Sequence, residues 1–260
     1  MSVKYTGSKR WLVKVLRPIE EIYEPFAGSA VISFRRSERC HLNDSISALI
    51  SMYRRMQVDQ EKFVGEVTKM IDTIRSSPCS STAYYEMRSK FNRGDMLDPV
   101  MFCTILYLGF NGLYRVGPNG CNVPYGGDDR RFDPSGLLST PVDKIASLAC
   151  LPWEQAEVPN ETCTIYADPP YFGAFTGYTS AGWTQADNEA LFSWLANKPN
   201  PVLLSCLRSD ENEKLLRKVG LDYITLSKTF SNGRGSVTKG EILAFNELSI
   251  PSIVFREVRR

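Results

Sequence analysis

The chain has 260 residues, 43% hydrophobic and 23% charged, with a formal net charge of +2. This length and composition suit one large α/β domain, or one domain that carries a substantial insertion. No apolar run is long enough to cross a bilayer, which excludes a membrane-spanning protein and predicts no membrane partner. The small positive charge is weak support for an anionic partner.

The chain has a single histidine, His41, and seven cysteines without a C-x-x-C pair. One histidine argues against a Ser-His-Asp triad and a multi-histidine metal site, and we expect a structural role for His41 beside a predicted strand. The odd number of cysteines and the lack of a secretion signal favour free thiols over disulfides or zinc. We therefore expect no metal and a cytoplasmic protein.

The first part of the chain follows an α/β order. Residues 21–26 predict a short strand, residues 31–34 begin a helix, and residues 39–43 predict a second strand. A second helix over 45–57 follows from apolar residues at helical spacing.

The middle of the chain differs, because apolar residues at helical spacing predict three helices. These lie around residues 63–74, 84–91 and 100–108. The glycine-rich residues 110–127 predict a long loop or hairpin. Residues 128–160 are punctuated by Asp, Pro and Ser and show little periodicity.

The α/β order then resumes. Predicted strands cover 163–167, 201–206, 221–228 and 241–246, and predicted helices cover 185–196 and 210–218. We therefore expect one α/β domain from residues 1–56 and 161–260, interrupted by a mainly helical insertion at 57–160 with a hairpin near 110–127. Insertions of this kind usually carry specificity on a scaffold that carries the chemistry.

The predicted strand at 163–167 ends in Asp168-Pro169-Pro170-Tyr171. Two consecutive prolines cannot continue a central strand, because neither donates an N–H and both fix φ, so the chain must turn. The segment combines a carboxylate that can hold an amine, a turn that exposes a backbone carbonyl, and an aromatic ring that can stack on a base. Methylation of an exocyclic amine needs these groups, although an ordinary strand-ending turn can have the same composition.

A second motif, Phe26-Ala27-Gly28-Ser29-Ala30, lies between a predicted strand and a predicted helix, where a ligand can approach the backbone. It lacks the third glycine of a dinucleotide fingerprint, which disfavours NAD. Asp44 follows Gly28 by 16 residues and ends the next predicted strand, where an acid can bind a ribose diol. Its alternative role is as the N-cap of the helix at 45–57, which Ser45 could also fill. Together the two features indicate a nucleoside cofactor.

With residues 168–171, these motifs narrow the cofactor to S-adenosylmethionine, and the chain resembles the Dam-like, D12-class DNA adenine-N6 methyltransferases over nearly its whole length. Further segments at family spacing carry the resemblance: Lys4-Tyr5-Thr6-Gly7-Ser8-Lys9, Glu24-Pro25, Leu42-Asn43-Asp44, Asn111-Gly112-Leu113-Tyr114-Arg115, Asn122-Val123-Pro124-Tyr125-Gly126, Ser231-Asn232-Gly233 and Glu241-Ile242-Leu243. Some positions depart from the family pattern: Tyr5 replaces a tryptophan, Ser8 and Ala30 replace glycines, and residues 116–118 and Cys121 differ from its hairpin.

The resemblance implies a Rossmann-like S-adenosylmethionine-dependent methyltransferase domain with a mainly helical inserted target-recognition domain. Its substrate would be double-stranded DNA, in a bacterial cell or a phage-infected host, and a restriction endonuclease partner stays open. Catalytic roles fall to Asp168, Pro169, Pro170 and Tyr171. Cofactor contacts are expected from Tyr5, Lys9, Phe26, Gly28, Asp44 and Asp168. DNA contacts are expected from Lys4, Phe110, Asn111, Leu113, Arg115, Asn122 and Asn232.

An enzyme of this family methylates N6 of adenine in a short duplex site, with GATC as the expected site here. Because N6 is hidden inside a duplex, the base must flip out. Tyr171 would then stack on the ring, while the Asp168 carboxylate and the Pro169 carbonyl accept the two N6 protons. Arg115 would read a guanine edge or contact a phosphate.

The resemblance also extends to residues around the target base. Phe110 and Leu113 could wedge between bases, and Tyr178 would close over the target or pack in the core. Two other functions stay open, namely an amino-methyltransferase acting on RNA or on a protein glutamine, and a DNA-binding relative without catalysis. Asp rather than Asn at position 168 argues against the glutamine group, and the intact segment 168–171 argues against the inactive relative.

Overall fold

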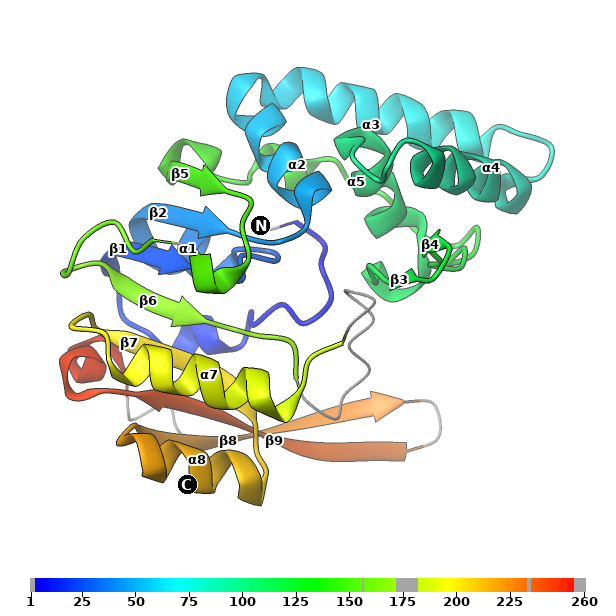
Figure 1. Cartoon of the computed structure of the whole chain (residues 1–260). Coiled ribbons are helices and arrows are strands. Elements are labelled where there is room, and N and C mark those ends of the chain that lie inside the picture. Colours follow the sequence, from blue (N-terminus) through cyan, green and yellow to red (C-terminus); the bar gives the residue numbers. More distant parts are fainter. Residues whose placement is uncertain (1–2, 156, 172–181, 233–234, 255–260) are drawn as a thin grey trace.

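The computed structural model of the chain describes residues 3–155, 157–171, 182–232 and 235–254, without the side chains of 227–239. Its centre is a seven-stranded sheet in the order β5-β2-β1-β6-β7-β9-β8 (Figure 1). The strands are β1 (Ile19–Glu24), β2 (Ser37–Asn43), β5 (Ile145–Ala149), β6 (Thr164–Ala167), β7 (Val202–Leu207), β8 (Asp222–Asn232) and β9 (Gly235–Phe245). In the described sheet, β9 runs antiparallel to both of its neighbours, β7 and β8, and the other strand pairs are parallel. This mostly parallel sheet confirms the expected Rossmann-like α/β class.

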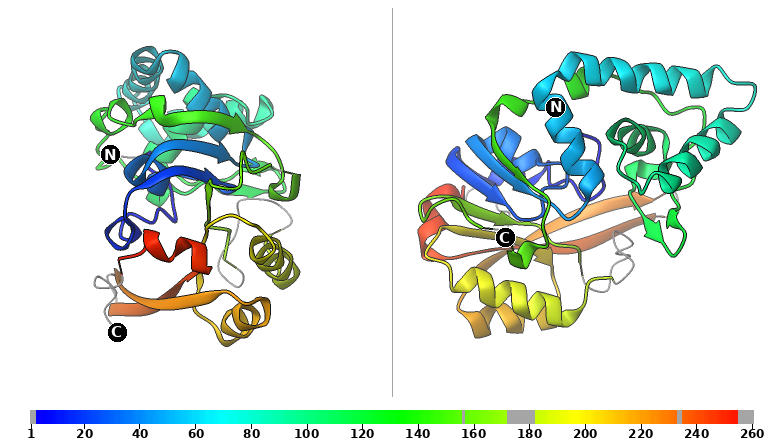
Figure 2. Two further views of the ribbon diagram at one scale, coloured as in Figure 1. Left: turned by 90° about the vertical axis from the view of Figure 1, so that its left-hand side faces the viewer. Right: turned by 45° about the horizontal axis from the view of Figure 1, so that its top comes forward.

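Helices cover both faces of the sheet. The α-helices are α1 (Val31–Arg36), α2 (Ser47–Val58), α3 (Gln60–Arg75), α4 (Ser80–Arg93), α5 (Pro99–Leu108), α6 (Ser135–Leu138), α7 (Gln185–Ala196) and α8 (Asp210–Val219). Short 3-10 helices are η1 (Leu12–Val15), η2 (Phe110–Gly112), η3 (Val142–Lys144), η4 (Trp153–Gln155) and η5 (Glu247–Ser252). In Figures 1 and 2, α7 and α8 lie on one face, whereas α1 and η5 lie on the other.

Local sequence signals fix the ends of several helices. Thr184 and Asp187 form a reciprocal capping box at the start of α7. The Asp98 carboxylate accepts hydrogen bonds from the second and third residues of α5, and Pro99 occupies the first position. Gly220 ends α8 in the left-handed conformation, with φ 79°, which glycine adopts without strain.

The helices α3, α4 and α5 form a block at one end of the sheet (Figure 1). The small hairpin of β3 (Val116–Gly117) and β4 (Gly120–Cys121) lies beside this block. The block shares its core with the sheet, since Phe63 of α3, Phe102 of α5 and Ile22 of β1 belong to one continuous cluster of buried side chains. The long β8–β9 hairpin extends past the other strands on the same side as the block (Figures 1 and 2).

One expected boundary differs from the structure. Residues 145–149 lie within the range expected as insertion, yet they form β5, which pairs parallel with β2. The segment is an edge strand of five residues, two of them exposed, so it lacks the apolar run of a central strand. Residues 145–149 are therefore part of the sheet, and the division into a domain at 1–56 and 161–260 with an insertion at 57–160 stays a proposal.

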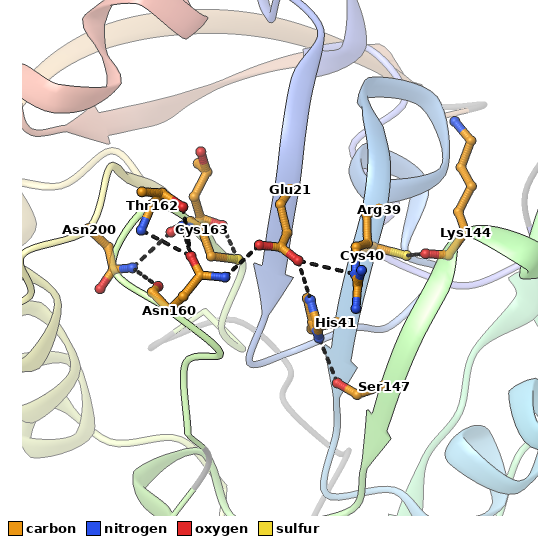
Figure 3. A network of polar contacts seen from close by, with 11 residues as sticks. Glu21, Arg39, Cys40, His41, Lys144, Ser147, Asn160, Thr162, Cys163 and Asn200 are labelled. Carbon is orange, nitrogen blue, oxygen red and sulfur yellow. Dashed lines mark hydrogen bonds and ion pairs between the residues drawn. The ribbon is translucent and has the colours of Figure 1, made fainter.

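His41 joins three strands of the sheet (Figure 3). Its Nε2 lies 2.9 Å from a carboxylate oxygen of Glu21 on β1, and its Nδ1 lies 2.8 Å from the hydroxyl of Ser147 on β5. Hydrogen bonds from His41 and then Asn160 hold the pKa of Glu21 below its ordinary value. Asn160 precedes β6 and donates to Glu21, so this network connects β1, β2 and β5 with the segment that leads into β6.

Candidate active site

A cavity of about 670 Å³ opens at the carboxyl ends of β1, β2 and β6. The chain passes from β1 to β2 on one side and later returns to β6 on the other, so the cavity lies at a switch in strand order. Ligands of open α/β sheets bind at such a switch. The volume is within the range of small-molecule sites.

The cavity gathers the residues that the sequence assigned to cofactor binding and catalysis. Its lining includes Tyr5, Lys9, Phe26, Gly28, Asp44, Asp168, Pro169, Pro170 and Tyr171. Among the side chains that the structure describes, none of those assigned to DNA binding lines it. The structure thus separates the two predicted groups in space, and the roles within each group remain proposals.

The turn after β1 is shaped by left-handed backbone conformations. Gly28 has φ 47°, which suits glycine, and Ala30 has the same φ although it carries a side chain. The Gly28 amide donates a 3.0 Å hydrogen bond to Asp44 at the end of β2. Asp44 thereby connects the turn to the neighbouring strand.

Asp44 is not the N-cap of α2, nor is Ser45. The helix begins at Ser47, with Ile46 as its N-cap residue. The second carboxylate oxygen of Asp44 accepts a 3.0 Å hydrogen bond from the Ile46 amide. Burial raises the pKa of Asp44 to about 6 despite these hydrogen bonds.

Two sides of the cavity contain residues that the sequence analysis did not assign to the site. Glu24 at the end of β1 is buried and accepts hydrogen bonds from the amide and hydroxyl of Ser33. Burial raises its pKa to about 8. Glu24 lies two residues before the motif at Phe26–Ala30, and this position is the sequence signal that could have indicated its place in the site.

The other side is aromatic. The ring of Phe26 lies 6.3 Å from that of Trp153 and 5.6 Å from that of Trp183, measured between centroids. Both tryptophans line the cavity. Trp153 lies in the stretch without periodicity, so no sequence pattern indicated it. The aromatic wall offers a surface on which a planar ring can pack.

Asp168 follows β6 directly, and Lys9 reaches it from the start of the chain. The Lys9 Nζ lies 2.9 Å from each carboxylate oxygen and 4.9 Å from the centroid of the Tyr171 ring. Burial raises the pKa of Asp168, and the ammonium of Lys9 acts in the opposite direction. Carboxylate, ammonium and ring therefore form one contiguous group at the cavity wall.

The residues assigned to DNA binding gather mainly around η2 and the β3–β4 hairpin. The side chain of Phe110 is 47% exposed, and Asn111 beside it is also exposed. Arg115 donates through Nε to the Asn122 side chain and through a terminal nitrogen to the Asn122 carbonyl at 2.9 Å. Leu113 is half-buried.

Two further DNA-binding residues lie elsewhere. Lys4 donates a 3.2 Å hydrogen bond to the Tyr107 carbonyl at the end of α5. Asn232 is the last residue of β8, and its side chain lies outside the described part of the structure, as does the whole of Tyr178.

The described residues hold no cluster of three or more His, Cys, Asp or Glu side chains that could bind a metal ion. Among the helices described, none is both long and apolar enough to cross a membrane. The fold, the turn at Gly28 and the Asp168 segment together define a Rossmann-like methyltransferase.

The chain belongs to the D12 class N6 adenine-specific DNA methyltransferase family, whose sequence model matches residues 5–230. It is similar to the Retron Ec67 DNA adenine methylase of Escherichia coli, with 26% identity over 259 residues, covering 93% of this chain and 90% of that protein. It is also similar to the Type II methyltransferase M1.LlaDCHI of Lactococcus lactis subsp. cremoris, with 29% identity over 269 residues, covering 92% of this chain and 91% of that protein. The protein is therefore an adenine-specific DNA methyltransferase.

Proposed function

We propose that this enzyme transfers the methyl group of S-adenosylmethionine to N6 of an adenine that is flipped out of a short site in double-stranded DNA. GATC is the candidate site. The observation that carries the proposal is that Asp168 and Tyr171 line the same cavity as Gly28 and Asp44. One cavity thus offers an acceptor for a ribose and an acceptor for an exocyclic amine.

The residues of the cavity fit S-adenosylmethionine, which supplies an electrophilic methyl group on its sulfonium. Asp44 would accept hydrogen bonds from the ribose diol. With a pKa of about 6, it is mostly ionised at neutral pH and is a strong acceptor. Phe26 and Trp153 provide an aromatic surface for the adenine ring of the cofactor.

The target amine would be oriented by residues at the end of β6. The Asp168 carboxylate would accept one N6–H and the Pro169 carbonyl the other. The N6 lone pair is then free of both acceptors and available to attack. Since no nucleophile of the protein takes part, catalysis would come from orientation and from polar groups held in place before the reaction.

Lys9 competes with this arrangement. Its ammonium contacts both oxygens of Asp168 and lies above the ring of Tyr171, where the target base would stack. Each carboxylate oxygen can accept two hydrogen bonds, so the ion pair alone does not exclude the amine, but the base can stack on Tyr171 only if the ammonium moves off the ring. Lys9 therefore has two states in the proposed cycle, one on Asp168 and one displaced from it.

Target recognition would come from η2 and the β3–β4 hairpin. Exposed Phe110 is suited to wedge between bases, and unstacking costs about a few kcal/mol per flipped base. The guanidinium of Arg115 is oriented by Asn122. A guanidinium fixed in this way is suited to read a guanine edge through two hydrogen bonds.

The test is to incubate the protein with S-adenosylmethionine and DNA free of N6-methyladenine, and then to sequence the DNA by a modification-sensitive method. We expect N6-methyladenine within one short motif. Asp168→Ala should give none, whereas Asp143→Ala, an exposed carboxylate outside the cavity, should behave as wild type. Absence of DNA methylation by the wild-type protein, or methylation of RNA in its place, would overturn the proposal.

A further inference from the structure

Residues 4–9, here called the strap, connect the DNA-recognition side of the molecule with the active site. At one end, the Lys4 ammonium donates to the Tyr107 carbonyl at the end of α5. At the other end, Lys9 contacts both oxygens of Asp168. Six residues span at most about 20 Å, so the strap is a short connection.

The recognition end of the strap holds the turn of η2. Asn111 and Gly112 both have left-handed backbones, with φ 54° and 65°. The Thr6 hydroxyl donates to the Gly112 carbonyl at 3.0 Å. The turn is also close-packed against the strap, because a Cβ atom on Gly112 would lie 3.1 Å from the Lys4 side chain.

This turn is where the proposed DNA contacts converge. Phe110 and Asn111 are part of it, and Leu113 follows directly. Arg130 donates a 3.2 Å hydrogen bond to the Asn111 side chain from the other side. A DNA duplex that contacts these residues would therefore displace a turn whose Asn111 and Gly112 carbonyls lie 3.4 and 3.0 Å from the Thr6 hydroxyl.

The active-site end of the strap is equally well connected. Ser8 and Ser29 share a 3.1 Å hydrogen bond, which joins the strap to the cofactor turn. The side chain of Lys9 is only 6% exposed, and its ammonium also donates a 2.9 Å hydrogen bond to the Gly7 carbonyl within the strap. A displacement of the strap therefore changes the position of the Lys9 ammonium relative to Asp168.

We propose that Thr6 couples DNA recognition to catalysis, by transmitting movement of the η2 turn through the strap to Lys9 and so releasing Asp168 for the target amine. The inference rests on the function proposed above. Thr6 lines the cavity, and the role argued for it is that of a positioning residue that acts through Lys9. In this proposal the strap has two states, with Lys9 on Asp168 or displaced from it, and coupling follows because the strap contacts both the η2 turn and Asp168.

The test compares Thr6→Val, which removes the hydroxyl and keeps the shape, with Thr6→Ser, which keeps the donor. Single-turnover methylation rates are measured on a duplex with the cognate site and on duplexes changed at one base of that site. We expect Thr6→Val to reduce the ratio of cognate to altered-site rates by about tenfold, a usual size of coupling. Thr6→Ser should retain the wild-type ratio.

Thr73→Val is the matched control, because Thr73 also donates to a backbone carbonyl, that of Lys69 at 2.8 Å, but lies in α3. It should leave the ratio unchanged. Thermal unfolding shows whether each variant is folded. If Thr6→Val is not folded, Thr6→Ala is used in its place. The dissociation constant for cognate DNA should be the same in the Thr6 variants and in wild type.

Three results would overturn the coupling role: a wild-type ratio in Thr6→Val, an equal loss in Thr6→Ser, or a loss of DNA affinity that accounts for the loss of rate. Each of them requires an active wild-type enzyme. If the wild-type protein does not methylate duplex DNA at all, the proposed function fails first. The two failures are therefore distinguishable.

Discussion

The Nζ atom of Lys9 lies 2.9 Å from both carboxylate oxygens of Asp168, although the two residues are 159 positions apart in the chain. Their side chains are 6% and 20% exposed, so the pair is largely removed from water. Removing one partner of a buried ion pair leaves the other charge buried without a partner, which lowers the stability of the folded protein. This contact makes the state of Asp168 depend on a residue of the strap.

The first prediction concerns the pH dependence of methyl transfer in Lys9→Met. Burial raises the pKa of Asp168, and Lys9 opposes that rise, so removing the ammonium raises the pKa further. The carboxylate is then protonated at higher pH, and the acidic limb of the single-turnover rate should move to higher pH. Lys14→Met, an exposed lysine of η1, should leave that limb in place. An unmoved limb in Lys9→Met would show that the ion pair does not control Asp168.

The second prediction concerns stability and Glu24, whose pKa rises from 4.5 to about 8 on burial. Between these values the folded state binds the proton more tightly than the unfolded state, so the wild-type free energy of unfolding falls as pH rises. Each unit of pKa shift corresponds to about 1.4 kcal/mol. Glu24→Gln keeps an oxygen acceptor for Ser33 and removes the titration. Its stability relative to wild type should therefore grow from pH 5 to pH 8.

Chemical unfolding of Glu24→Gln and wild type measures this difference in the free energy of unfolding. The measurements are made at pH 5, 6.5 and 8, which span the range between the ordinary and the raised pKa of Glu24. Ser33→Ala separates loss of the hydrogen bond from loss of the charge, because it retains the Glu24 carboxyl. A constant difference between Glu24→Gln and wild type across the range would mean that Glu24 titrates normally in the folded state.

The third prediction concerns Arg115 and Asn122. If Arg115 reads a guanine edge, Arg115→Ala should lose about 1–3 kcal/mol of discrimination at one base pair and retain most binding to unrelated DNA. Asn122→Ala should lose part of the same discrimination at the same base pair, since Asn122 orients the guanidinium. Methylation rates on duplexes changed at each position provide the measurement. A uniform loss across all sequences would reassign Arg115 to a phosphate contact.

The fourth prediction concerns salt. A protein that binds the DNA backbone releases counterions, so its affinity should fall steeply as salt rises, with a log-log slope of about −0.9 for each phosphate contacted. Titrations of a labelled duplex at several salt concentrations give this slope. Lys4→Ala should make it shallower if Lys4 contacts a phosphate, and should leave it unchanged if Lys4 reads a base. A flat response in the wild-type protein would argue against a nucleic-acid substrate.

Sequence patterns predicted the parts of the fold that depend on local signals. The bounds of α7 agree with the expected helix at 185–196, because a capping box and helical periodicity both mark it. Residues 168–171 follow β6 at the expected place, since two prolines must end a strand. These features are encoded by neighbours in the sequence.

Other parts depend on contacts between distant segments. β5 is a short edge strand that is recognisable only by its pairing with β2. Trp153 lines the cavity because the chain returns to the sheet through β5, which no periodicity indicates. Lys9 was assigned to the cofactor, and its contact with Asp168 requires the three-dimensional arrangement. The coupling proposed for Thr6 likewise depends on a hydrogen bond across the fold.

The central claim is that Asp168 holds and orients the target amine. The most direct measurement is the single-turnover rate of methyl transfer by Asp168→Ala to a duplex with the cognate site, together with its dissociation constant for that duplex. The claim predicts that the rate falls to background while DNA binding stays close to that of wild type. A rate near that of wild type, with DNA binding intact, would contradict it.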